Sequence, residues 1–199
     1  MEEASGESLQ RWMTENLFNP CSMDATYDLA ALPESAFLVS SKRLFPPSRK
    51  FAFDASKRRQ SAIITNSPDP LTHYGLAAGG LFATAKALYS FIKSLTPVEG
   101  KILSRETMAH MLSPLTTQSF ENYDCGFGMG IFCLTNRRGV QIYGHQGFAY
   151  GAVQGAFWRP DSGKIVISLN GGADEARMGR LGRTNMDVIN TFLGGGEWI

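Results

Sequence analysis

Residues 125–170 read CGFGMGIFCLTNRRGVQIYGHQGFAYGAVQGAFWRPDSGKIVISLN, and this stretch decides the fold. Four runs within it, at residues 125–135, 139–147, 151–160 and 164–170, have the period-two pattern of β-strands. The turn signals NRRG and PDSG separate the first run from the second and the third from the fourth. Because strands joined by short turns pair antiparallel, the stretch predicts a four-stranded antiparallel β-meander.

Before and after this stretch, apolar residues recur at helical spacing. The predicted helices cover residues 5–17 with Ser5 as cap, residues 81–95 with Thr84 as cap, a segment that starts at Ser104 and ends before Pro114, and the closing segment 173–195. Residues 36–45 add one predicted strand upstream. Since helices come first, then a sheet and then a closing helix, we expect an α+β fold, in which the antiparallel meander has flanking helices and the C-terminal helix packs on the sheet.

Composition and charge limit the classes of function. With 199 residues and 43% hydrophobic content, the chain can form one domain or a large piece of a bigger one. A net charge of +1 gives no overall field that would attract nucleic acid or an anionic membrane, so we expect neither as a partner. No apolar run has the length of a membrane span, and MEEASGESLQRW lacks the apolar centre of a signal peptide.

One basic run departs from this balance. Between Lys42 and Arg59, seven Lys or Arg residues stand against one Asp. Such a run is usually a solvated loop, and contact with an acidic polymer is the alternative. We favour the loop, because the run is irregular and has no aromatic platform.

The cysteines and two of the three histidines suggest structural roles. Cys21, Cys125 and Cys133 fit no zinc or redox spacing, so we expect small buried side chains. His73 falls in a Pro-rich loop and His110 in a predicted helix, and no histidine pair has metal-ligand spacing. The sequence therefore predicts no metal and no cofactor.

Two short motifs match catalytic patterns in an unsuitable context. Ser90 and Lys93 form a Ser-x-x-Lys pair, in which the serine should open a helix at a cleft edge. Ser90 comes late in a predicted helix, so we interpret the match as accidental. The glycines of GFGMG, residues 126–130, precede no helix, which argues against a phosphate loop and favours close packing against one face of the strand.

His145 differs from the other histidines in its neighbours. Gly144 and Gly147 clear side chains from both sides of it, and Phe148 and Tyr150 add aromatic rings. A strand edge with glycines can offer backbone N–H groups to a ligand at close range. From the residues alone, a binding site and an ordinary strand histidine are equally open interpretations.

The chain resembles the serine β-lactamase and penicillin-binding-protein superfamily in four segments that follow one another in the same order: AAGGLFATAKALYSFI, ILSRETMAHMLSP, YDCGFGMGIF and YGHQGFAYGAVQGAFWRPDSGKIVISLNGG. The class C-like branch, with its D-alanyl-D-alanine carboxypeptidases and esterases, is the most similar. SGESLQRWMTENLFNPCSM also resembles that branch, whose Pro-Leu-Gly-Met element corresponds to Pro20-Cys21-Ser22-Met23. The resemblance implies a β-lactamase-like fold over nearly the whole chain.

The resemblance implies roles for the residues around His145. Members of the superfamily carry a Lys-Thr-Gly or His-x-Gly triplet on the strand at the cleft edge, and His145-Gln146-Gly147 matches it. His145 would then face the nucleophile, Gly147 would leave room for substrate, and the Phe148 N–H would be an oxyanion-hole donor. The expected substrate-binding residues are Gln146, Tyr150 and Arg177. Arg177 suits a substrate carboxylate, and a solvent-facing arginine is the alternative.

Two other elements of the superfamily, the Ser-x-x-Lys nucleophile and a Tyr-x-Asn base, precede the part matched by residues 3–23. We therefore expect residues 1–199 to be the C-terminal part of one β-lactamase-related domain, with a helical and loop region at 1–120 and the sheet strands plus closing helix at 121–199. Such a half would be inactive alone and would expose an unpaired strand edge, which favours self-association or binding of the complementary half. Its location stays open, since an export signal would lie in the other half.

The expected function is that of part of a serine hydrolase. It would cleave peptide, amide or ester bonds of a small-molecule or peptide substrate through an acyl-enzyme. A non-catalytic, penicillin-binding-like protein used for binding or scaffolding is the alternative.

Overall fold

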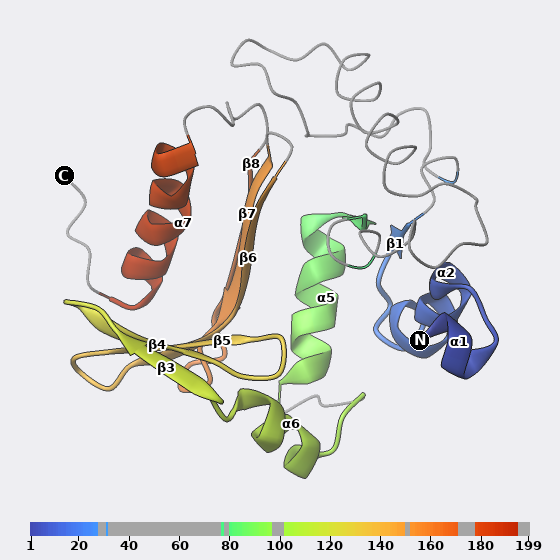
Figure 1. The fold of residues 1–199 in the computed structure, drawn as a ribbon, viewed down its shortest axis with the longest axis horizontal. Coiled ribbons are helices and arrows are strands. Elements are labelled where there is room, and N and C mark those ends of the chain that lie inside the picture. Colours follow the sequence, from blue (N-terminus) through green and yellow to red (C-terminus); the bar gives the residue numbers. More distant parts are fainter. Residues whose placement is uncertain are drawn as a thin grey trace, which may run out of the picture.

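The structure, a computed structural model, describes residues 1–27, 31, 77, 80–96, 102–149, 152–170 and 178–194. Its centre is a six-stranded sheet with a helix on each face (Figure 1). Several predictions fall outside the described residues: the strand at 36–45, the basic run at 42–59, His73, Tyr150 and Arg177.

The sheet is an antiparallel meander in which neighbouring strands follow chain order. Its strands are β3 (Thr116–Ser119), β4 (Tyr123–Phe127), β5 (Phe132–Asn136), β6 (Gln141–Ala149), β7 (Ala152–Trp158) and β8 (Ile165–Asn170). The predicted meander and the α+β class are confirmed, but the sheet has six strands instead of four. β3 was not predicted, and it precedes the sheet region expected at 121–199.

Both differences in strand number have a local cause. The run 125–135 is a hairpin, because the chain turns at Gly130, which has a φ of 74°, and the Gly128 N–H donates to the Ile131 carbonyl at 2.9 Å. β3 has four polar residues that are all exposed, so its sequence shows no alternation of apolar and polar positions.

The helices before the sheet begin mostly at the predicted caps. The Thr84 side chain accepts the Ala87 N–H at 3.0 Å at the start of α5 (Ala85–Leu95). In the same way, Ser104 accepts the Thr107 N–H at 3.0 Å at the start of α6 (Arg105–Leu112), which ends before Pro114 as predicted. The predicted cap at Thr84 and the predicted helix start at Ser104 are confirmed.

The first predicted helix is divided, and Ser5 is not its cap. Ser5 ends α1 (Glu2–Ser5), and Gly6 stops that helix in the left-handed conformation at φ 70°. Ser8 caps α2 (Leu9–Met13) by accepting the Arg11 N–H at 3.3 Å, and a π-helical segment, η1 (Thr14–Phe18), continues it. A short ladder joins β1 (Ala25–Thr26) to β2 (Phe82–Ala83).

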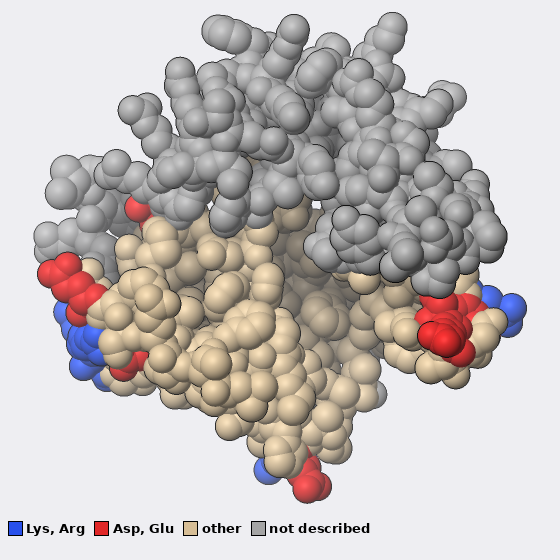
Figure 2. All heavy atoms as spheres, in the orientation of Figure 1, with Lys and Arg blue, Asp and Glu red and all other residues tan. Residues whose placement is uncertain are grey.

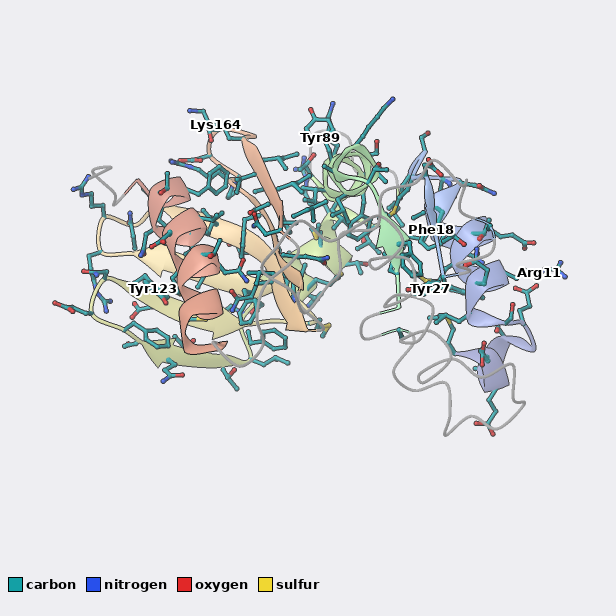
Figure 3. All side chains as sticks on the ribbon, turned by 90° about the horizontal axis from the view of Figure 1, so that it is seen from above. Arg11, Phe18, Tyr27, Tyr89, Tyr123 and Lys164 are labelled. Carbon is teal, nitrogen blue, oxygen red and sulfur yellow. The ribbon has the colours of Figure 1, made fainter. Side chains whose placement is uncertain are left out.

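Two cores hold the helices to the sheet (Figure 1). The closing helix α7 (Met178–Phe192) covers one face, where Ile189 packs with Ile142 and Phe157, as predicted for a helix lying on the meander. On the other face, Ile92 and Leu95 of α5 pack with Trp158, Met108 and Ile131. A third cluster joins the amino-terminal helices to α5, and in it Phe18 and Tyr27 have ring centroids 6.1 Å apart (Figure 3).

The cysteines fit the structural role predicted for them. Cys21 and Cys133 are buried, Cys125 is half-buried, and all three are free thiols. Within the described ranges, no helix has both the length and the apolar character needed to cross a membrane.

Candidate active site

The edge of β6 is open where the His-Gln-Gly triplet lies. β6 pairs with β5 only up to Gly144, whereas its pairing with β7 continues to Ala149. In the described part of the chain, residues 145–149 therefore have a strand on one side only. Backbone groups on such an edge can hydrogen-bond an extended ligand that lies alongside as an added strand.

The triplet divides between the two faces of the sheet. Gln146 is paired with Gly155, and a Cβ added to Gly155 would stand 3.4 Å from the Oδ1 of Asn185 in α7. This pair therefore belongs to the face under α7. Because side chains alternate along a strand, His145 and Gly147 lie on the opposite face. The structure places His145 and Gly147 on one face, and the substrate contact expected for Gln146 stays a prediction.

By its register, His145 lies on the face that α5 covers, and its ring contacts two phenylalanines of the β4–β5 hairpin, of which Phe132 also packs with the core under α7. Its partner Ala156 packs against the core that α5 shares with the sheet. The His145 ring is 5.0 Å from the Phe132 ring, at 36°, and 6.1 Å from the Phe127 ring, at 66°. The sequence does not identify either phenylalanine as a neighbour of His145, because the run 125–135 predicts a single strand and not the turn that brings them together.

Gly144 and Gly147 have different surroundings. A Cβ on Gly144 would collide with the Ala156 carbonyl oxygen and the Phe157 ring, so the close approach of β7 requires glycine there. A Cβ on Gly147 would meet nothing within 4 Å. Gly147 is exposed, and no atom of the described residues fills the space beside it, so its role in leaving room for substrate stays a prediction.

Two of the three glycines of GFGMG, Gly126 and Gly128, serve packing as predicted, whereas Gly130 has the positive φ of a turn. A Cβ on Gly126 would lie 2.5 Å from the Pro114 Cβ, and one on Gly128 would collide with the Met111 carbonyl oxygen. These glycines let the segment after α6 approach the β4–β5 hairpin.

Other polar groups near the triplet do not suit nucleophilic or base chemistry. Burial raises the pKa of the Cys133 thiol and of the Tyr143 hydroxyl. The thiol donates to the Leu112 carbonyl at 3.1 Å, and the hydroxyl to the Gln141 side chain at 3.3 Å. Both groups stay protonated at neutral pH. In the described residues, His, Cys, Asp and Glu form no group of three that could hold a metal ion.

The Ser90–Lys93 pair has the unsuitable placement expected from the sequence. Ser90 lies in the middle of α5, where its carbonyl accepts the Ser94 hydroxyl at 2.9 Å. The Lys93 ammonium lies 5.6 Å from the centre of the Tyr89 ring, an exposed side chain labelled in Figure 3. Of the remaining candidates, the Phe148 backbone lies in β6 opposite Val153.

Solved structures of the same fold are about twice as long or longer. A D-stereospecific amidohydrolase from Streptomyces sp. has a TM-score of 0.57 and 21% identity over 87% of this chain and 46% of its own. A penicillin binding protein from Bacillus halodurans has a TM-score of 0.61 and 17% identity over 92% of this chain and 52% of its own. The octameric penicillin-binding protein homologue from Pyrococcus abyssi has a TM-score of 0.62 and 18% identity over 87% of this chain and 36% of its own.

Sequence comparison gives the family. No curated protein matches the chain. The Beta-lactamase family model, however, matches residues 1–188, which is nearly the whole length. The six-stranded sheet, the closing helix and the fold shared with penicillin-binding proteins agree with that match. The chain therefore belongs to the Beta-lactamase family, within the superfamily of serine β-lactamases and penicillin-binding proteins.

Proposed function

We propose that this chain forms the sheet side of the active site of a serine hydrolase, which cleaves a peptide, amide or ester bond through an acyl-enzyme. The observation that carries the proposal is the open edge of β6, where His145-Gln146-Gly147 lies in a chain of the Beta-lactamase family. The serine itself comes from outside these 199 residues. That part of the proposal fits a chain that spans 46% of the Streptomyces amidohydrolase.

The proposed reaction takes place along this edge. Substrate lies along residues 145–149, over the open space beside Gly147. The serine oxygen attacks the scissile carbonyl, and the Phe148 N–H donates to the oxyanion as it forms. His145 faces the nucleophile and provides a hydrogen bond during proton transfer to the leaving amine or alcohol. Water then attacks the acyl-serine, which releases the acid and restores the serine hydroxyl.

The substrate class follows from the same elements. A family of acyl-transfer enzymes and an extended edge favour an amide or ester with a peptide-like backbone. The Streptomyces neighbour is a D-stereospecific amidohydrolase, so amides of D-amino acids are the first substrates to assay. Arg177 remains our proposal for a carboxylate partner, with Tyr150 and Gln146 as further contacts. A D-alanyl-D-alanine carboxypeptidase or esterase activity of the class C-like type is the finer form of the proposal.

The test uses the longer protein that contains these residues. A fluorophosphonate probe and a fluorescent penicillin should label it covalently, and the unextended chain should not be labelled. A His145→Ala variant should lower the labelling rate at least about ten-fold, the scale of a lost catalytic hydrogen bond. Ser90→Ala is the matched control and should be labelled at the parent rate.

Each result leads to a definite conclusion. Labelling that disappears in Ser90→Ala would make Ser90 the nucleophile and overturn the proposed arrangement. A folded longer protein that neither probe labels would contradict the hydrolase and favour a non-catalytic binding protein of the same fold.

A further inference from the structure

An aromatic cluster stands at the start of the open edge of β6. Phe127 ends β4, Phe132 begins β5, and the two rings meet at 69° with centroids 5.0 Å apart. His145 lies against both rings, 5.0 Å from Phe132 and 6.1 Å from Phe127. Three rings from three strands thus converge beside the residue that faces the scissile bond in the proposed reaction.

Part of this cluster is unusually exposed for aromatic side chains in a core sheet. Phe127 leaves 39% of its surface accessible and the neighbouring Met129 leaves 54%. The backbone holds both in place: the Phe127 carbonyl accepts the Leu115 N–H at 2.9 Å, and the Met129 N–H donates to the Met111 carbonyl at 3.1 Å. An ordered apolar surface next to a binding edge is a usual mark of a recognition site.

The surroundings favour an uncharged ligand group. Figure 2 shows the charged atoms of the described residues at the margins of the pictured face, and none of the ion pairs within the described residues includes a residue of the cluster. The ring arrangement favours an aromatic group, because the three rings already meet one another at tilted and edge-to-face angles, the geometries in which aromatic rings pack favourably. An ammonium or carboxylate placed against the Phe127 and Phe132 rings would lose hydration, and neither ring offers it an ion-pair partner.

We propose that Phe127 and Phe132 form an apolar subsite beside His145, which takes an aromatic side chain of the substrate adjacent to the scissile bond. The inference rests on the proposed function for the position of that bond. It adds a specificity: the preferred substrate is a phenylalanine-like amide or ester over an alanine-like one.

The experiment measures ligand binding to the chain itself, which requires no nucleophile. The probes are N-acetyl-phenylalanine methylamide and N-acetyl-alanine methylamide, in both D and L forms, titrated while the ring signals of His145 are followed by NMR. The phenylalanine probe should bind roughly three- to ten-fold more tightly, the gain expected from one added aromatic contact. The His145 ring signals should shift with the phenylalanine probe only.

Matched variants separate the subsite from general aromatic adhesion. Phe127→Ala should abolish the difference between the probes, and Phe127→Leu, which keeps apolar volume, should reduce it. Phe120→Ala is the control: Phe120 is 41% exposed, and it stacks on Tyr123 at 5.1 Å instead of on His145. It should keep the parent preference.

The results distinguish failure of the subsite proposal from failure of the hydrolase proposal. Equal affinity for both probes, no binding of either, or equal losses in Phe127→Ala and Phe120→Ala would overturn the subsite, whatever the fluorophosphonate result in the longer protein. A phenylalanine preference in a longer protein that is not labelled would retain the subsite and reject the hydrolase.

Discussion

Gly155 on β7 and Asn185 on α7 face each other so closely that a Cβ on Gly155 would stand 3.4 Å from the Asn185 Oδ1. Asn185 is fully buried, and neither atom of its amide has a hydrogen-bond partner in the described structure. Gly155 is also the partner of Gln146, so Asn185 lies on the same face of the sheet as Gln146 and on the opposite face from His145. A buried amide without partners lowers the stability of the fold at this point.

Replacing Asn185 by leucine should therefore stabilise the chain. The two side chains have the same branched shape and the same number of heavy atoms, and the substitution removes two unsatisfied polar atoms, so the free energy of unfolding should rise by about 1–2 kcal/mol. Urea unfolding followed by circular dichroism measures this. Thr184→Leu, at an exposed position of the same helix, should change it by less than about 0.5 kcal/mol. A loss of stability in Asn185→Leu would mean that the amide makes a hydrogen bond in solution.

Ser22→Gly should also be stabilising. Ser22 has a φ of 52°, the left-handed region, which costs a residue with a Cβ about 1 kcal/mol more than glycine. We expect the free energy of unfolding to rise by about 0.5–1 kcal/mol. Ser113→Gly, at a φ of −75°, should instead lower it by a similar amount, because glycine adds freedom to the unfolded chain. Equal changes in both variants would contradict the left-handed strain.

Local patterns predicted the elements whose signals lie within a few residues. The caps at Thr84 and Ser104, and the turns between β5 and β6 and between β7 and β8, each depend on one or two residues with a special backbone role. Ser5 failed as a cap because Gly6 favours a helix end directly after it. The polar β3 could not be found, since its strand structure depends on pairing with β4.

The candidate site shows the same limit. The triplet at 145–147 could be recognised from sequence, and its position at an open strand edge agrees with the resemblance. Phe127 and Phe132 could not be connected to His145, because their contacts arise from the β4–β5 turn and the crossing of strands. The opposite faces of Gln146 and His145 follow from alternation once the strand is known.

The Arg159–Asp161 pair should make stability depend on pH in the acid range. Two Arg159 nitrogens donate to the Asp161 carboxylate, at 3.0 and 2.5 Å, and they lower the pKa of that carboxyl to about 2. The folded pKa lies below the unfolded value of about 3.9, so the stabilisation is complete above about pH 4 and is lost as the pH falls towards 2.

Thermal unfolding of the parent chain and of Asp161→Asn tests this pair. Between about pH 6 and about pH 2.5, the parent should lose more of its Tm than the variant, which lacks the titrating carboxyl. The Asp161 side chain is 52% exposed, so about 1 M NaCl should reduce the difference at pH 6. A parent and a variant with parallel Tm losses would show that the pair contributes nothing to acid stability.

Alanine substitutions of two glycines in β6 should distinguish an effect on stability from an effect on substrate binding. Gly144→Ala places a methyl group against the Ala156 carbonyl and the Phe157 ring, so the free energy of unfolding should fall by more than about 2 kcal/mol. Gly147→Ala places its methyl group in open space, so stability should stay the same or rise by up to about 1 kcal/mol.

In the longer protein, that same methyl group occupies the space proposed for substrate beside His145. Gly147→Ala should therefore lower kcat/KM for amide and ester substrates about ten-fold or more while the Tm is unchanged. Full activity in Gly147→Ala would exclude substrate from this part of the β6 edge, whereas a Gly144→Ala variant of parent stability would contradict the close approach of β7.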